Sequence, residues 1–404
     1  MAAEQSVSPS QIIWKRLKKN AAAMAGLVIV ITAVVVSAFC YLFMPDRTPD
    51  ANEMNLPLST LSPGTSVQLL QIPLKSEVVM PPFYERIFTG TPGSFKSVAI
   101  DTLWMKGDTV YYREFSGDPE FLFPEEQKHF AELYTGSSDY KFTDQYIVWT
   151  DASGIEQKSD VTSARKELMQ GRLTTRIYYL GTDRFGRDLL SRILAGTRVS
   201  ISVGLIAVII SLVIGITFGA LAGFFRGWVD DVIMWLINVI WSIPTLLLVI
   251  AITLALGKGF AQVFIAVGLT MWVEVARVVR GQIFSLREME FVEAGRALGF
   301  SNTRIILRHI LPNIVSPVIV IAASNFASAI LLEAGLSFLG MGAQPPTPSW
   351  GMMIKENYGY IIVDAAYLAV YPGLAIMIMV LAFTWLGNGL RDAVDAREGS
   401  GSKA

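Results

Sequence analysis

Between two long apolar segments the chain reads Ser285-Leu-Arg-Glu-Met-Glu-Phe-Val-Glu-Ala-Gly-Arg-Ala-Leu-Gly299. Ser285 followed three residues later by Glu288 matches a capping box, which predicts that a helix begins there. Gly299 suits the left-handed residue that ends a helix. We therefore expect a helix of about 13 residues, about 20 Å long. It exposes Phe291, Val292 and Leu298 beside charged residues, which favours docking onto a partner.

The composition indicates a membrane protein. Of the 404 residues, 52% are hydrophobic and 17% are charged, which is too apolar for an ordinary soluble domain. The net charge is −1 and no long Lys/Arg block occurs, so the sequence gives no electrostatic indication of nucleic-acid binding. The single cysteine, Cys40, excludes disulfide and Cys-based zinc frameworks. His129 and His309 lie far apart in sequence, which argues against a multi-His metal site.

Six segments have the roughly 20 mostly apolar residues that a bilayer-spanning helix needs. They are Ala21–Phe43, Val199–Phe224, Asp231–Leu256, Phe260–Gln282, Asn313–Met341 and Ala366–Leu390. Lysines and arginines at 15–19 precede the first, so the N-terminus is expected in the cytoplasm. The first segment is too long for a cleaved signal peptide and is interpreted as an anchor. Pro244 predicts a kink in the third, and Gly204, Gly215, Gly219 and Gly223 predict a close-packing face in the second.

These spans divide the chain as follows. Residues 1–20 form a cytoplasmic N-terminal segment, 21–44 the first transmembrane helix, 45–180 an extracytoplasmic domain and 181–198 a segment before helix 2. Residues 199–391 form the membrane core with helices 2–6 and a cytoplasmic loop at 283–312, and 392–404 form a cytoplasmic tail.

The 45–180 domain has an ordinary soluble composition and is expected to be β-rich. Strands are expected at Ser66–Leu70, Val98–Leu103, Thr109–Phe115 and Gln145–Thr150, and helices near Glu125–Tyr134 and Ser163–Gln170. We find no nucleophile elbow or metal-ligand spacing in it.

The quoted stretch resembles the EAA motif, or coupling loop, of bacterial ABC importer permeases. That motif runs Glu-Ala-Ala, three residues, Gly, nine residues, then Ile-x-Leu-Pro. The matching residues here are Glu293, Ala294, Gly299, Leu311 and Pro312, with Gly295 in place of the second Ala and His309 in place of Ile. A Gly inside a helix costs about 1 kcal/mol relative to Ala, which hints at close packing of Gly295. The alternative is an amphipathic loop that agrees with the motif by chance.

A second run, at Gly181-Thr182-Asp183-Arg184-Phe185-Gly186-Arg187-Asp188, is similar to the signature of C-type permease subunits for dipeptides, oligopeptides and nickel. The runs Leu332–Gly342, Pro346–Gly351 and Arg391–Asp395 also fit that family. The resemblance covers about two thirds of the chain and implies an all-α membrane protein with six transmembrane helices, the type I ABC importer permease fold. The β-rich extracytoplasmic domain is a departure, inserted between helices 1 and 2. It contacts a binding protein, packs against a partner permease, or stiffens the outer mouth.

The resemblance implies a non-catalytic permease subunit that forms half of a path for di- or oligopeptides. Because no Gly-x-x-x-x-Gly-Lys-Ser/Thr loop occurs, ATP must be hydrolysed by a separate chain, with Glu293 and Gly299 serving its coupling to transport. The chain is then expected to bind no cofactor, since ATP and Mg²⁺ are used by the ATPase. Its expected partners are a homologous B-type permease, ABC ATPase subunits, an extracytoplasmic substrate-binding protein and membrane lipid, at a bacterial inner membrane. Peptide is preferred, but nickel, opines, glycosides or antibiotics stay open.

Ionisable residues inside membrane spans are usually functional. Glu274 lies in the fourth span toward its cytoplasmic end, and we interpret it as the partner of Arg277 three residues on, with Arg280 reaching the interface. The alternative is a functional role for Glu274. Glu333 lacks a local basic partner, so with Asn325 and Ser328 it is a candidate for lining the pathway. The alternative for these three residues is hydrogen bonding between helices.

Three other classes compete with an ABC importer. A secondary transporter should show paired broken helices or internal repeats, which we do not find convincingly. A membrane-anchored sensor using the inserted domain would need a cytoplasmic output domain. A membrane enzyme would need a nucleophile and base, and the sequence suggests none.

Overall fold

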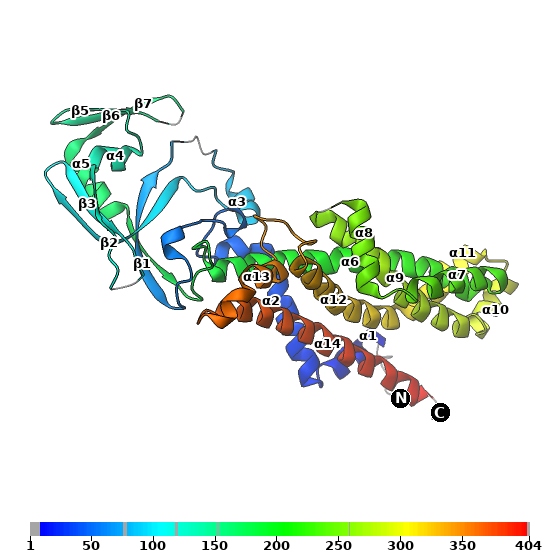
Figure 1. The fold of residues 1–404 in the computed structure, drawn as a ribbon. Coiled ribbons are helices and arrows are strands. Elements are labelled where there is room, and N and C mark those ends of the chain that lie inside the picture. Colours follow the sequence, from blue (N-terminus) through cyan, green and yellow to red (C-terminus); the bar gives the residue numbers. More distant parts are fainter. Residues whose placement is uncertain (1–8, 76–78, 118–119, 152, 258, 402–404) are drawn as a thin grey trace, which may run out of the picture. The chain divides into compact units, whose positions relative to one another are not determined.

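The computed structural model describes residues 9–75, 79–117, 120–151, 153–257 and 259–401 (Figure 1). Residues 1–8 of the expected N-terminal segment and 402–404 of the expected tail lie outside the described part. The chain forms two compact units. The first takes its described residues from 1–37, 196–355 and 372–404, and the second takes its own from 38–195 and 356–371.

The first unit is helical. Its elements, some of which continue into the second unit, are α1 (Pro9–Leu17), α2 (Ala21–Phe43), α6 (Leu189–Phe225), α7 (Gly227–Trp241), α8 (Thr245–Leu256), α9 (Phe260–Leu286), α10 (Glu290–Ala297), α11 (Asn302–Ile305), the π-helical turn η4 (Ile306–Ile310), the 3₁₀ turn η5 (Leu311–Ile314), α12 (Val315–Phe338), α13 (Trp350–Asn357) and α14 (Tyr367–Gly401).

Five of the described helical segments are long and apolar enough to cross a membrane, or six if one bent pair counts as a single span. The five are Ala21–Phe43, Leu189–Phe225, Ala261–Leu286, Asn302–Phe338 and Tyr367–Val394. The bent pair is α7 and α8, which meet at 92°. The expected third span is therefore two helices, and the kink expected at Pro244 is a full break. Proline lacks an N–H and its ring clashes with the preceding turn, so the helix ends before it.

Small residues bring α6 and α9 into contact, as the glycine spacing predicted. A Cβ added at Gly215 would lie 2.5 Å from Cβ of Val275, and one at Gly219 would lie 2.6 Å from the carbonyl oxygen of Ala276. One at Gly223 would lie 2.8 Å from the carbonyl oxygen of Arg280. Gly204 meets α12 instead, where its Cβ would lie 2.4 Å from the ring of Phe326.

The second unit contains two antiparallel sheets (Figure 1). The five-stranded sheet has the order β4-β3-β2-β1-β8, and the three-stranded sheet has the order β5-β6-β7. The strands are β1 (Thr65–Pro73), β2 (Phe95–Lys106), β3 (Thr109–Glu114), β4 (Glu125–His129), β5 (Tyr140–Phe142), β6 (Tyr146–Thr150), β7 (Glu156–Asp160) and β8 (Leu173–Tyr178). The helices α3 (Phe83–Thr89), α4 (Phe130–Thr135) and α5 (Val161–Lys166) and the π-helical turn η3 (Glu167–Gly171) connect them.

The core of this unit lies between the five-stranded sheet and α4, α5 and η3. Its fully buried members include Leu70 and Ile100 of the sheet, Phe130 and Leu133 of α4, and Leu168 of η3. The neighbouring residues Leu69 and Ala99 belong to a second buried cluster with Leu58, Val67 and Tyr178, so apolar residues are buried on both faces of β1 and β2.

The four expected strands are confirmed as β1, β2, β3 and β6, and the helical prediction near Ser163–Gln170 is confirmed by α5 and η3. The helix expected at Glu125–Tyr134 is half wrong, because Glu125–His129 is strand β4 and α4 begins only at Phe130. Two side-chain contacts to β3 favour the strand. Arg113 pairs with Glu125 at 2.8 Å, and the Tyr112 hydroxyl donates to Glu126. Such cross-strand pairs override the helix propensity of glutamates.

Candidate functional site

The helix of the motif that resembles a coupling loop begins later than the sequence predicted. Ser285 lies inside α9, and its hydroxyl donates to the carbonyl oxygen of Gly281 over 3.4 Å. Glu288 pairs with Arg226 at 2.9 Å and with Arg287 at 3.3 Å. The capping box is therefore not formed, and α10 is an eight-residue helix that starts at Glu290.

The end of α10 agrees with the prediction for Gly299. This residue has a φ of +74°, in the left-handed region. Its N–H donates to the carbonyl oxygen of Arg296 over 2.9 Å, and the N–H of Phe300 donates to that of Gly295 over 3.0 Å. These two bonds form a Schellman motif, which satisfies carbonyl groups at the end of the helix.

One narrow face of α10 is buried and the rest is exposed. Val292 and Gly295 are buried, so the prediction that Val292 is exposed was wrong. Val292 belongs to the same apolar cluster as Ile283 of α9 and Ile305 of α11. A Cβ at Gly295 would lie 3.5 Å from the Phe300 ring and 3.7 Å from Ile305, which is ordinary contact. Close packing therefore does not require glycine at position 295.

The outer face of this region is apolar as well as charged. Exposed around Glu293 and Ala294 are large apolar side chains, namely Met289 (50%), Phe291 (39%), Leu298 (71%) and Leu307 (57%). Side chains of this kind, gathered on one short helix and its flanks, are typical of a surface that another molecule covers.

Arginines fix the loop to the end of α6. Arg287 donates from Nη1 to the carbonyl oxygen of Phe224 over 2.5 Å, and the Arg296 guanidinium lies 5.7 Å from the centre of the Phe224 ring. Leu311 and Pro312 form η5, which leads directly into α12, with Pro312 in the first turn as expected. His309 stacks on Phe300 with ring centres 5.7 Å apart. The loop is thus held by α6 and by its own aromatic contacts.

The signature run 181–188 forms a buried turn in the second unit. Thr182 donates its hydroxyl to the carbonyl oxygen of Leu58 and accepts from the N–H of Leu61 at 2.8 Å. Gly181 and Gly186 have φ values of +81° and +71°. Added Cβ atoms would lie 2.2 Å and 1.7 Å from backbone oxygens of neighbouring segments. Only glycine fits both positions without a shift of the backbone.

Asp183 and Arg187 form the charged centre of this turn. Asp183 accepts from the N–H groups of Phe185 at 2.9 Å and of Arg187 at 3.1 Å, and from Arg187 Nε at 2.6 Å. Arg187 also donates from Nη2 to Glu356 over 3.1 Å and from Nη1 to Asn52 over 3.2 Å. The guanidinium is thus matched to three acceptor side chains, which is how a buried charge is made tolerable.

Asp188 lies in the same run, but within the described chain the hydrogen bonds to its carboxylate come from the uncharged groups of Ser191 rather than from a guanidinium. Its Oδ2 accepts from the N–H of Ser191 at 2.8 Å and from the Ser191 hydroxyl, whose oxygen accepts in turn from the N–H of Asp46 at 2.9 Å. Burial raises the pKa of Asp188 above its ordinary value, and it also raises the pKa of Asp46. The signature therefore builds a buried structural turn. Among the described residues no cluster of His, Cys, Asp and Glu could hold a metal ion.

The three candidate pathway residues have different surroundings. Asn325 and Glu333 are buried, with exposed fractions of 0% and 1%. Glu333 accepts from the Ser337 hydroxyl at 2.6 Å, whereas the Asn325 amide has no hydrogen-bond partner within the described chain. Ser328 lines a cavity. Of the three, only Ser328 borders open space in this subunit, and pathway lining stays a prediction for all of them.

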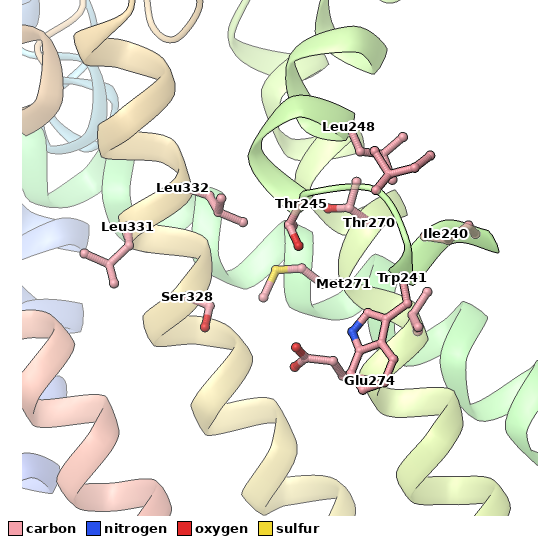
Figure 2. Close-up of a pocket in the computed structure, with 12 residues that line it drawn as sticks. Ile240, Trp241, Thr245, Leu248, Thr270, Met271, Glu274, Ser328, Leu331 and Leu332 are labelled. Carbon is pink, nitrogen blue, oxygen red and sulfur yellow. The ribbon is translucent and has the colours of Figure 1, made fainter. Parts of the chain in front are cut away.

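The cavity has a volume of about 290 Å³ and lies between α7, α8, α9 and α12 (Figure 2). Its lining consists of Ile240, Trp241, Ile243, Thr245, Leu248, Thr270, Met271, Val273, Glu274, Ser328, Leu331 and Leu332. Figure 2 shows the Glu274 carboxylate and the Ser328 hydroxyl directed into the space between α9 and α12. The break at Pro244 positions Trp241 and Thr245 on this wall.

Glu274 is a site residue that sequence reasoning misassigned. The expected pair with Arg277 is not formed. The Arg277 guanidinium lies 3.5 Å from the centre of the Trp241 ring and donates to Asn238 over 3.3 Å, while Arg280 pairs with Asp230 at 2.5 Å. The partners of both arginines come from α7, which the i,i+3 spacing along α9 could not reveal. The sequence analysis singled out Glu274 as an ionisable residue inside an apolar span, but the pairing that it favoured is not the one formed.

Comparisons with known proteins show the family of this chain. Residues 215–399 match the family described as binding-protein-dependent transport system inner membrane component, and residues 8–58 match the N-terminal TM domain of oligopeptide transport permease C. The glutathione transport system permease protein GsiD of Pectobacterium atrosepticum is 42% identical over 220 residues, which cover 54% of this chain and 73% of the relative. The chain belongs to this family of ABC importer permeases.

Two further relatives extend the comparison. The GsiD protein of Escherichia coli O6:K15:H31 is 44% identical, and the dipeptide transport system permease protein DppC of Alkalihalophilus pseudofirmus is 42% identical. Each alignment covers 54% of this permease and 72% of the relative. Inward-facing structures of the MetNI methionine ABC transporter give a TM-score of 0.41 at 20% identity, covering 51% of this permease and 96% of the matched chain. As a permease of an ABC importer, the chain is a membrane-spanning, non-catalytic subunit.

Proposed function

We propose that this permease carries di- or oligopeptides into bacterial cells through the inner membrane. The names of its relatives support a peptide cargo, since they describe glutathione and dipeptide transport. One subunit supplies half of the translocation path, and a homologous B-type permease supplies the other half. A substrate-binding protein delivers the peptide on the outer side. ATP and Mg²⁺ are bound by a separate ABC ATPase, and this chain binds no cofactor.

The main structural support for this proposal is the exposed face of α10. Phe291 and Leu298 are large apolar side chains left open beside Glu293, on a helix whose inner face is fixed by Val292. We assign this face to the ATPase. Aromatic and aliphatic anchors of this size contribute most of the affinity in protein interfaces, and a nearby carboxylate adds orientation.

Coupling follows from how the loop is held. Arg287 and Arg296 fix it to Phe224 at the end of α6, and Ile283 of α9 shares a cluster with Val292. A displacement of α10 by a closing ATPase is therefore passed to α6 and α9, because packed elements move as units. Glu293 pairs with the ATPase, and Gly299 provides the sharp exit from the helix.

The proposed orientation places both termini and loop 283–312 in the cytoplasm. Lys15, Arg16, Lys18 and Lys19 before α2 and the arginines of the loop support it. The β-rich unit then lies outside the cell. Its proposed role is contact with the binding protein or with the partner permease.

Purification of the tagged chain from its host in mild detergent tests this assignment. We expect an ABC ATPase to co-purify with the wild type and to be lost with Leu298→Asp and with Glu293→Arg. Leu122→Asp is the matched control, because Leu122 is a similarly exposed apolar residue (55%) in the β-rich unit. Retention of the ATPase by both loop variants would contradict the docking face. Peptide uptake by a preparation without any ATPase would instead establish a secondary transporter.

A further inference from the structure

Glu274 occupies an unusual place in the membrane-spanning part of the chain. It lies 14 residues after the first residue of α9, Phe260, and 12 before the last, Leu286. At 1.5 Å per residue this is about 20 Å from either end. A charged group at this depth is costly unless it faces water, a counter-ion or a ligand. The side chain is exposed in this subunit and borders the cavity of Figure 2.

The nearby cations are engaged elsewhere. Arg277 rests on Trp241 and donates to Asn238, and Arg280 is paired with Asp230. Within the described residues Glu274 forms no ion pair. The cavity therefore presents a carboxylate that makes no ion pair with a described cation of the subunit.

The rest of the lining is suited to an ammonium group on an organic stem. The hydroxyl oxygens of Thr245, Thr270 and Ser328 are hydrogen-bond acceptors, which an ammonium group needs. Thr270 already donates its proton to the carbonyl oxygen of Val267 over 2.8 Å, so its oxygen acts as an acceptor in the cavity. Leu331 and Leu332 add apolar wall. About 290 Å³ is near the lower limit of ligand pockets and fits one end of a peptide rather than a whole one.

We propose that this cavity is a subsite for the primary ammonium group of the transported molecule, with Glu274 as its counter-ion. The assignment rests on the proposed function and narrows its substrate class to molecules with a free, protonated amine, such as a peptide N-terminus. Arg277 serves as a positioning residue, because its contact with the Trp241 ring holds that wall of the cavity in place.

Cysteine modification in the assembled transporter tests the charge of the cavity. The only native cysteine of this chain, Cys40, is buried, so the unmodified chain provides the blank. With Ser328→Cys, we expect a cationic thiosulfonate to react about fivefold faster than an anionic one of similar size, because a carboxylate across the cavity attracts it. Adding Glu274→Gln should bring the two rates close together. Adding Asp231→Asn, which removes an exposed carboxylate near the start of α7, should leave the ratio unchanged. Equal rates with Glu274 intact would overturn the proposal.

Measuring uptake by the complete transporter in vesicles tests the Glu274 subsite separately from the assignment as a peptide importer. With a saturating dipeptide-loaded binding protein, Glu274→Gln should lower uptake about tenfold, and Glu274→Asp should retain part of it. The free dipeptide should also slow modification of Cys at position 328. Normal dipeptide uptake by Glu274→Gln would refute the subsite and leave the importer assignment standing. Absence of dipeptide uptake by the wild type would refute the peptide cargo itself.

Discussion

Arg187 donates from Nε to Oδ2 of Asp183 over 2.6 Å, and each side chain is only 2% exposed. The pair lies in the run 181–188, which resembles a signature of C-type permease subunits, and each member also bonds elsewhere in the same unit. Removing one member of such a pair leaves the other charge buried and uncompensated. The pair therefore stabilises the fold, and its substitution should act on folding before it acts on transport.

Asp183→Ala should destabilise the protein by about 3–5 kcal/mol, because Arg187 would keep its charge without its main acceptor. The matched control is Glu125→Ala, which breaks the partly exposed pair with Arg113 at a cost of at most about 1 kcal/mol. Thermal unfolding of the detergent-solubilised protein measures both. Similar losses in the two variants would show that burial of the Asp183–Arg187 pair is not decisive.

Gly186→Ala should be severely destabilising, by more than about 3 kcal/mol, since a methyl group there meets the carbonyl oxygen of Asn55 at a left-handed φ. Gly107→Ala is the comparison. Its φ of +61° is equally left-handed, but no atom lies within 4 Å of the added Cβ. That variant should cost about 1–2 kcal/mol from backbone strain alone. Expression level and unfolding temperature should rank the two in this order, and the reverse ranking would contradict the packing of the turn.

The stability of the second unit should depend on the pH through Asp188. Burial raises the pKa of Asp188 above 3.8, so the folded state holds this proton more tightly than the unfolded state. Stability from this group is present at low pH and is lost as the pH rises from 3.8 through the raised folded value. Unfolding temperatures measured from about pH 7 down to about pH 4.5 should therefore rise in the wild type relative to Asp188→Asn.

Asp160 is a control for which the opposite dependence of stability on pH is expected, because its pKa is lowered rather than raised. The N–H of Ser163 donates to it, and its pKa is lowered. Its contribution is fully present above pH 3.8 and is lost as the pH falls from 3.8 through the lowered folded value, so the wild type should lose stability relative to Asp160→Asn only when the scan is extended below about pH 4. If both variants change the pH profile in the same direction, the assigned environments are wrong.

The features that the sequence predicted correctly depend on residues close together in the chain. Gly299 adopts the left-handed conformation expected of it, and Pro312 sits in a first helical turn. The glycine spacing in α6 predicted a close-packing face, because small residues at intervals of about four lie on one helix face, and the structure packs Gly215, Gly219 and Gly223 of that face against α9. The strands β1, β2, β3 and β6 followed from their alternation of apolar and polar residues.

What the sequence could not predict depended on partners distant in the chain. Glu288 is drawn to Arg226, 62 positions earlier, and so the capping box is not formed. Arg277 contacts Trp241 of α7 rather than Glu274 of its own helix, and this leaves Glu274 open to the cavity. Glu125 became part of a strand because Arg113 of β3 lies opposite. In each case a long-range contact outweighed a local preference.

The residue at position 295 gives a direct test of how α10 works. The family motif has Ala there, and the structure leaves room for it, since a Cβ would meet Phe300 and Ile305 at 3.5 Å or more. Gly295→Ala should therefore stabilise α10 by about 1 kcal/mol through helix propensity, with ATPase binding and transport preserved or improved. Gly299→Ala, four residues on, should cost about 1–2 kcal/mol, because Gly299 has a φ of +74°. The hydrolysis of ATP stimulated by a substrate-loaded binding protein, divided by substrate uptake, reports coupling for each. A loss of coupling with Gly295→Ala would mean that α10 must bend at this glycine during transport, which would contradict the proposal that α10 passes its displacement to α6 and α9 as a unit.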